Sequence, residues 1–323
     1  MPSFDRRRNQ TPNKPGFRDV RPCPEKMLYS AAMAKRVLRF ELYSIHAHLA
    51  TDIPVDYMKL FETMPSLQGY HLEESKHHIA IGKANFSSGR LFIVAYTGYS
   101  EKSMLFFDVT AKEELTESTV PGRFQARKTY AMVDGRKRFL LIEMKKGNLS
   151  PADLAFALEA HVQTALPEYK SLELVFNPIA DVEFIKRLEA LARIQAATVT
   201  IGRPNPDWTD RHNQLTEVAD ESNAKALDVT ARAKRGKSLS KDAGLVQFVK
   251  HFAGSAMTMF QKIKITGQLG ADSGLITLDL SKHIEHVNIP FDVDPKTHLP
   301  NDGDVQREMS AYLDSKELES KEA

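Results

Sequence analysis

The strongest constraint on the fold is a pair of β-rich segments between Lys128 and Lys145, separated by Asp134 and Gly135. An Asp-Gly pair between two such segments favours a type I′ turn, in which both central residues have a positive φ. This sequence therefore predicts a β-hairpin closed by a two-residue turn. A helix is predicted directly after the hairpin, because Ser150 is a suitable N-cap and a proline follows it.

The hydrophobic pattern predicts an α+β fold whose N-terminal half is rich in antiparallel strands. Its second half follows a β-α-β-α-β pattern that begins near Lys170. A Ser-Ser-Gly sequence between two early strands favours another hairpin. Strands are predicted over residues 37–46, 77–84, 90–96, 104–109, 172–176, 197–202, 226–233, 257–267 and 274–280, and further helices over residues 52–64, 181–194, 207–223 and 238–254.

Composition and charge divide the chain into four parts. Residues 1–34 are expected to form a disordered basic arm, because they are rich in proline and arginine and lack apolar periodicity. An α+β domain is expected over residues 35–168 and an α/β-like domain over residues 169–291. Residues 292–323 are expected to form an acidic tail with one marginal helix over 305–318.

Composition also excludes several classes of protein. The 323 residues are 42% hydrophobic and 27% charged, which is typical of globular proteins and not of disordered or fibrous ones. The single cysteine, Cys23, excludes an internal disulfide and a cysteine-rich metal centre. No apolar run approaches the ~18–20 residues of a membrane span, and the N-terminus does not resemble a secretory signal. We therefore expect a soluble cytoplasmic protein without a membrane span, and no motif indicates a cofactor.

The net charge of +2 conceals strongly basic segments. Residues 123–146 contain eight basic and two acidic residues, and residues 225–264 contain nine and two. Such density attracts polyanions, although it also suits the solvated faces of ordinary strands and helices. The candidates for phosphate contacts are Arg123, Arg127, Lys128, Arg136, Lys137 and Arg138 at the hairpin, and Arg232, Lys234, Arg235, Lys237 and Lys241 in the second segment. Backbone amides at 238–240, where a helix is predicted to start, would add anion contacts.

One pattern indicates enzymatic chemistry. Asp134, Glu143 and Lys145 match the Asp…Glu-x-Lys arrangement of magnesium-dependent nucleases. If Glu143 lies nine residues along the outgoing strand from Asp134, a rise of ~3.3 Å per residue separates them by roughly 30 Å. Ligands of one metal ion need to lie far closer, so a cross-strand charge pair is the favoured interpretation.

The histidines are weaker candidates for a metal site. His46 and His48 would share one face of a strand, but no acidic residue stands at a familiar spacing for a third ligand. His77 and His78 are adjacent, so a strand would point them to opposite sides.

The segments around residues 203–225 are the most unusual. Capping and strand termination explain most of their residues, and Arg203 and Trp208 remain as a candidate partner-facing corner.

The sequences Arg-Pro-Asn-Pro-Asp at 203–207 and Glu-Ser-Asn-Ala-Lys at 221–225 resemble a poorly characterised family of bacterial and phage-encoded proteins. Members of that family are found among mobile elements and defence genes. The Gly-Lys-Ser-Leu turn at 236–239 and the segment 139–151 carry the same resemblance.

The resemblance covers residues 35–290 and excludes the arm and the acidic tail. The architecture is also remotely similar to that of the phage exclusion protein RexA and the Kiwa defence component KwaB. These resemblances imply a homodimeric two-domain α+β protein that binds DNA without marked sequence preference and acts against phage. A second defence subunit is a further candidate partner. No catalytic residue is carried over from these proteins.

The sequence thus favours a non-enzymatic nucleic-acid-binding protein, with duplex DNA as the expected ligand and antiphage defence as the expected role. Its binding would come mainly from phosphate neutralisation. The alternatives are a metal-dependent nuclease that uses Asp134, Glu143 and Lys145, and a protein–protein adaptor whose basic surface meets an acidic partner.

Overall fold

Strands and helices are mixed and the strand pairings are antiparallel, which confirms the predicted α+β class. The computed structural model describes residues 35–50, 54–74, 77–100, 103–108, 113–118, 120, 123–202, 224, 226–255, 258–270 and 273–316. The basic arm over 1–34, the helix predicted over 207–223, and the corner residues Arg203 and Trp208 lie outside these residues. No helix in the described part of the chain is long and apolar enough to cross a membrane.

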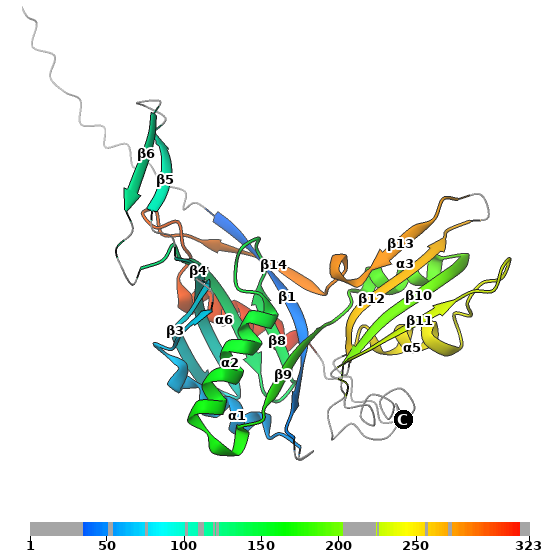
Figure 1. The fold of residues 1–323 in the computed structure, drawn as a ribbon, viewed down its shortest axis with the longest axis horizontal. Coiled ribbons are helices and arrows are strands. Elements are labelled where there is room, and N and C mark those ends of the chain that lie inside the picture. The colour runs from blue at the N-terminus through cyan, green and yellow to red at the C-terminus, as the bar shows by residue number, and fades with distance from the viewer. Residues whose placement is uncertain are drawn as a thin grey trace, which may run out of the picture. The chain divides into compact units, whose positions relative to one another are not determined.

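Eight strands form the large sheet, in the order β14-β1-β8-β7-β4-β3-β2, and β9 pairs with a further part of β1 (Figure 1). The strand β1 is long enough to pair with β14 along Lys35–Glu41, with β8 along Phe40–Ser44 and with β9 along Tyr43–His48. The strands are β1 (Lys35–His48), β2 (His71–Glu74), β3 (His77–Ser87), β4 (Arg90–Tyr99), β7 (Arg127–Asp134), β8 (Phe139–Glu143), β9 (Glu173–Pro178) and β14 (His286–Asp292). A separate two-stranded sheet contains β5 (Ser103–Asp108) and β6 (Glu113–Ser118).

The predicted hairpin around residue 134 is confirmed, but the predicted two-residue turn is wrong. Asp134 pairs with Phe139, so four residues close the turn between β7 and β8. The positive φ falls on Arg138, at 56°, and not on Gly135. The cause is the Asp134 carboxylate, whose Oδ1 accepts hydrogen bonds from the backbone N–H groups of Arg136 (3.1 Å) and Lys137 (2.9 Å). This side chain therefore organises a longer loop, as aspartates at turn entries often do.

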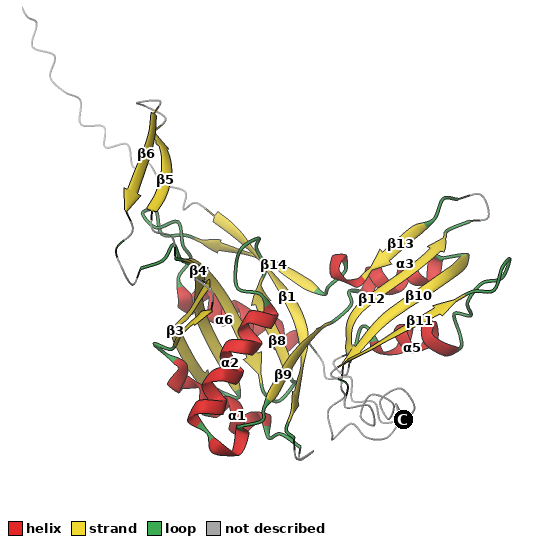
Figure 2. Ribbon diagram, viewed as in Figure 1, coloured by secondary structure: helices red, strands yellow, loops and turns green. Residues whose placement is uncertain are grey.

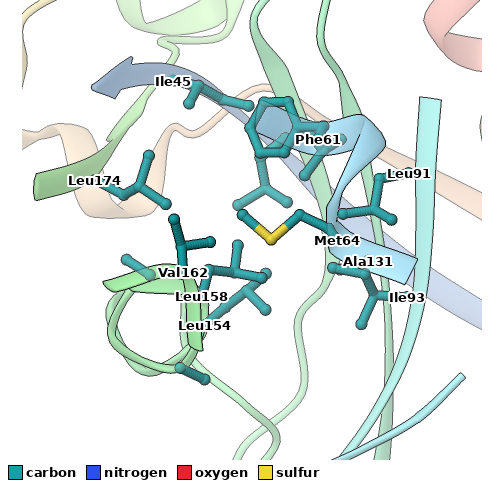
Figure 3. Close-up of a cluster of buried hydrophobic side chains, with 14 of the residues drawn as sticks. Ile45, Phe61, Met64, Leu91, Ile93, Ala131, Leu154, Leu158, Val162 and Leu174 are labelled. Carbon is teal, nitrogen blue, oxygen red and sulfur yellow. The ribbon is translucent and has the colours of Figure 1, made fainter. Parts of the chain in front are cut away.

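One face of the large sheet is covered by α1 (Tyr57–Glu62), the 3-10 turn η1 (Met64–Leu67) and α2 (Pro151–Ala165). The predicted start of α2 is confirmed, because the Ser150 and Asp153 side chains each bond to the other's backbone N–H. Figure 3 shows Leu158 and Val162 of α2 packed near Met64, in a core that also includes residues of β1, β4 and β7. Burial of this apolar face fixes the helices on the sheet.

The helix α6 (Asp302–Ser315) covers the other face of the large sheet, as Figure 1 also shows. Its residues Val305, Met309 and Leu313 are fully buried, at the i, i+4, i+8 spacing of one helix face. Residues 292–323 were expected to form an acidic tail outside the domains. Residues 302–315 of this segment instead form α6, because three apolar side chains on one helix face are enough to dock an otherwise acidic helix on the sheet.

Four strands form the small sheet, in the order β11-β10-β12-β13. They are β10 (Arg193–Gly202), β11 (Ala226–Arg232), β12 (Phe260–Gln268) and β13 (Ile276–Asp279). The helices α3 (Val182–Ala190) and α5 (Gly244–Phe252) pack on the same side of this sheet (Figure 2), where Val199 and Ile263 are fully buried. Two predicted helix bounds are wrong: Ile194 lies in β10, and α5 begins six residues after the predicted start at Ser238.

The predicted domain boundary near residue 168 does not match the strand pairing. β9 and β14 fall within the predicted second domain, apart from the last residue of β14, but both pair with β1 of the large sheet. The short turns η2 (Pro167–Tyr169) and η3 (Leu280–Lys282) precede these two strands. The chain therefore enters the small sheet after β9 and returns to the large sheet at β14, so only the segment between them forms the small sheet and its helices.

Candidate nucleic-acid interface

Three of the six hairpin cations predicted to bind phosphate are engaged within the protein. The Lys128 ammonium lies 2.6 Å from the Asp302 carboxylate of α6. Lys137 donates to the Leu313 carbonyl (2.7 Å) at the end of the same helix, and the Arg138 guanidinium lies over the Tyr57 ring. These three side chains connect the hairpin to its neighbours and are not available as a free basic surface.

The protonation state of Lys128 follows from the same contacts. Burial alone would lower the pKa of Lys128, but hydrogen bonds with Asp302 and Tyr130 outweigh it and raise the pKa above its ordinary value. The side chain is thus charged and already neutralised by α6. An external anion would have to displace Asp302 in order to bind this cation.

The other hairpin candidates lie at the surface. Arg123, Arg127 and Arg136 are exposed, and Arg127 donates to the Lys146 carbonyl (2.9 Å). Lys145 and Lys146 are exposed in the turn that follows β8. Arg136 lies in the loop between β7 and β8, whereas Arg127 lies at the opposite end of β7, so the structure does not gather these cations into one group.

The second basic segment forms a loop between β11 and α5. Arg232, Lys234, Arg235 and Lys237 are exposed, and none of them forms an ion pair with any residue that the structure describes. A backbone hydrogen bond from Lys237 to Lys234 (2.9 Å) closes a tight turn around Gly236, whose φ of 76° suits glycine. We call residues 232–237 the basic loop.

Two contacts hold the basic loop against the small sheet. The Arg193 guanidinium of β10 donates to the Lys237 carbonyl (3.1 Å), and Ala233 donates through its backbone to Gln195 (2.8 Å). Lys241, the last candidate, is half-buried and donates to the Glu189 carbonyl (2.6 Å) at the end of α3. Four of the five predicted cations therefore lie together in the basic loop. The fifth, Lys241, instead connects the following segment to α3.

The predicted amide contacts at residues 238–240 are wrong. α5 starts at Gly244, so these residues do not form a helix N-terminus. The Leu239 N–H donates to the Ile194 carbonyl (2.9 Å), and the Ser238 hydroxyl accepts from the Ile194 N–H (2.9 Å). Both groups are used to attach the loop to β10.

The nuclease residues are not brought together. Because Ala131 pairs with Ile142, Glu143 lies opposite Tyr130. That position is four residues from Asp134, or about 13 Å along the strand. The hairpin thus shortens the separation expected from sequence but leaves the carboxylates too far apart to bind one ion. Asp134 is also buried and bound to Arg90 (2.9 Å), and Lys145 is exposed.

Glu143 has an unusual environment of its own. It is 2% exposed, its Oε1 lies 3.7 Å from the Arg36 guanidinium, and its Oε2 has no hydrogen-bond partner among the residues that the structure describes. Burial raises the pKa of Glu143, and Arg36 partly opposes that effect. Among the described residues, no three histidine, cysteine, aspartate or glutamate side chains are placed to hold a metal ion.

The histidines belong to separate clusters. His46 is fully buried, and its Nε2 donates to the Thr258 carbonyl (2.8 Å), so it joins β1 to the segment before β12. His77 lies 2.7 Å from the Thr97 hydroxyl, whereas His78 stacks on Phe124 and bonds to His71 (2.9 Å). The adjacent pair therefore has different neighbours, as the strand geometry predicts.

Lys262 and Lys264 were not among the predicted candidates, and they lie on β12, in the same sheet as the strand that leads into the basic loop. Both are exposed, and fully buried Ile263 lies between them. The alternation Lys-Ile-Lys-Ile is the signal that could have identified them, because a period of two places both lysines on one face of a strand.

These features define a mixed α+β protein with two antiparallel sheets and an exposed basic loop at the small sheet. Residues 36–256 match the family described as a domain of unknown function, DUF4747, and the chain belongs to this family. No curated protein matches the sequence.

Proposed function

We propose that the protein binds nucleic acid through the basic loop, with duplex DNA as the ligand and without marked sequence preference. The observation that carries this proposal is the contrast between the two basic segments. Lys128 and Lys137 at the hairpin are bound by α6, whereas Arg232, Lys234 and Lys237 are exposed without an ion pair in the described part of the chain. Unpaired cations on an ordered turn are the groups that phosphates can bind at the least cost.

The proposed mechanism is phosphate neutralisation. Each lysine or arginine that contacts a phosphate releases condensed counterions, so affinity falls steeply with salt. The turn around Gly236 and its bond to Arg193 hold the loop in one conformation, which limits the entropy lost on binding. The loop itself carries no aromatic side chain, so base stacking would contribute little.

The test is the triple variant Lys234→Ala, Arg235→Ala and Lys237→Ala, measured by fluorescence anisotropy with unrelated duplexes at several salt concentrations. Three lost phosphate contacts should reduce the slope of log affinity against log salt by about 2.7, at about 0.9 for each contact. The affinity loss should be similar for all sequences.

The matched control is the triple variant Lys170→Ala, Lys186→Ala and Lys282→Ala, which removes the same charge from exposed positions outside the loop. It should bind nearly as the native protein does. Unchanged affinity and slope in the loop variant would refute the site. Tighter binding to an acidic protein than to DNA would favour the adaptor alternative.

The biological setting is part of the same proposal and rests on the sequence resemblance alone. We propose a cytoplasmic homodimer that acts in antiphage defence, with a second defence subunit as a partner. Light scattering on the purified protein tests the dimer, and the plating efficiency of phage on cells with and without the protein tests the role. Equal plating on both strains would remove the defence proposal and leave DNA binding to be judged separately.

A further inference from the structure

One face of the small sheet, which we call the open face, is not covered by any helix that the structure describes, and hydrogen bonds connect its side chains. The Thr198 hydroxyl of β10 lies 3.1 Å from that of Thr230 on β11, and Thr200 donates to Asp228 (2.6 Å). On the other side of the sheet's centre, the hydroxyls of Thr266 and Thr277 lie 3.3 Å apart. These contacts show that the side chains project from the same face.

The lysines of β12 belong to this face. Lys264 pairs with Thr198 in the strand register and contacts the Asp279 carboxylate of β13 at 3.6 Å. Lys262 pairs with Thr200, one row along the strands. The opposite face holds the apolar residues that pack under α3 and α5. The open face is therefore polar, rich in threonine and basic, and no described helix covers it.

The open face is continuous with the basic loop. Arg232 ends β11 two residues beyond Thr230, so its side chain projects from the same face. The loop and the face together carry Arg232, Lys234, Arg235, Lys237, Lys262 and Lys264, against the acidic residues Asp228 and Asp279. Each of these carboxylates already has a partner on the sheet.

The contact between Lys264 and Asp279 does not prevent Lys264 from binding an anion. The Lys264 side chain is 61% exposed. Exposed ion pairs of this kind contribute little, so a phosphate can replace the carboxylate at small cost.

We propose that this face binds the sugar–phosphate backbone of a duplex, as an extension of the loop site; this inference rests on the proposed function. The face spans about 13 Å from Asp228 to Arg232 and about 14 Å from β11 to β13. At 3.4 Å per base pair along one strand, it covers roughly four base pairs. Lysines neutralise phosphates there, and threonine hydroxyls donate to phosphate oxygens.

The chemistry of the face selects a duplex over a single strand. No aromatic residue stands at the outward positions of the four strands. Proteins that prefer single strands stack bases on aromatic rings, and this face cannot do so. A duplex instead presents phosphates outward with its bases already stacked.

The experiment uses a double variant that combines Lys262→Thr and Lys264→Thr, because threonine suits an exposed strand position. The control is Lys170→Gln with Lys186→Gln, which removes the same charge elsewhere; Lys186 lies on α3, across the same sheet. Binding to a 16-base-pair duplex and to a 16-nucleotide single strand is measured by anisotropy across a salt series. Circular dichroism and light scattering accompany each measurement.

For the duplex, we expect the slope of log affinity against log salt to be smaller by about 1.8 in the double variant, at about 0.9 per phosphate contact. The slope of the control should not change. The native protein should bind the duplex more tightly than the single strand. If the loop variant weakens binding and the double variant does not, the loop site stands and the face proposal fails. If neither variant changes binding, both proposals fail. Stronger binding to the single strand, or a change of oligomeric state without a change in DNA affinity, would also overturn the face proposal.

Discussion

Asp134 provides a direct test of whether the hairpin is structural or catalytic. Its side chain is 4% exposed, and it accepts three hydrogen bonds. Oδ1 accepts from the backbone N–H groups of Arg136 and Lys137, and Oδ2 accepts from the Arg90 guanidinium (2.9 Å). Asp134→Ala removes all three and leaves Arg90 without one of its two carboxylates.

Breaking a buried ion pair by removing one partner costs about 3–5 kcal/mol. The lower end applies here, because Arg90 keeps its contacts with Asp314 (2.6 Å) and the Ser310 carbonyl (3.1 Å). With an unfolding entropy of about 2.1 cal/mol/K per residue, a loss of about 3 kcal/mol corresponds to a fall in Tm of about 4–5 °C for a protein of this size. Asp134→Asn keeps the oxygen that organises the turn and loses only the charged contact with Arg90, so we expect about 1–2 kcal/mol.

The assay is urea denaturation and thermal melting followed by circular dichroism. Asp242→Ala is the control, because that side chain is 89% exposed and its removal should change the free energy of unfolding by less than about 0.5 kcal/mol. A free energy of unfolding for Asp134→Ala within 1 kcal/mol of the native value, together with loss of a magnesium-dependent cleavage activity, would refute the structural role and restore the nuclease alternative.

Two further predictions concern the core. Leu313→Ala, at a fully buried position of α6, should lower the free energy of unfolding by about 2–5 kcal/mol in urea denaturation; a loss below about 0.5 kcal/mol would mean that α6 is not packed on the sheet. Glu143→Gln should change the pH dependence of stability. Because burial raises the pKa of Glu143, the folded protein holds a proton that the unfolded chain has lost, and native stability falls as pH rises from the ordinary glutamate pKa to the raised one. Glutamine cannot titrate, so the stability of the variant relative to the native protein should increase with pH over that interval, and a constant difference would contradict the assignment.

Local sequence signals were sufficient for many elements. The capping box at Ser150 and the Asp181 N-cap of α3 depend on residues within one turn of the helix, and both helices start where the sequence places them. The strand alternation from Val37 is equally local, and β1 covers it. The hairpin at Asp134 shows the limit of such signals. The dipeptide predicts a turn, but the Asp134 carboxylate lengthens it by accepting from the Arg136 and Lys137 N–H groups. The same carboxylate is bound by Arg90, a residue 44 positions away that no local pattern identifies.

The candidate site was found only in part for the same reason. Composition identified both basic segments but could not tell which cations were free. Lys128 pairs with Asp302, and Lys137 donates to the Leu313 carbonyl, and both partners lie in α6, more than 170 residues further along the chain. The lysines of β12 gained their significance from strand pairing with Thr198 and Thr200.

The fold class, most of the strands and the starts of α2 and α3 follow from the sequence alone, because periodicity and capping act between residues that are near neighbours in the chain. Tertiary structure decided that β9 and β14 join the large sheet, that the acidic C-terminal segment packs as α6, and that the basic loop stays exposed. Those outcomes depend on burial and charge pairing between distant segments, and no local pattern encodes which partner a strand, a helix face or a lysine will meet.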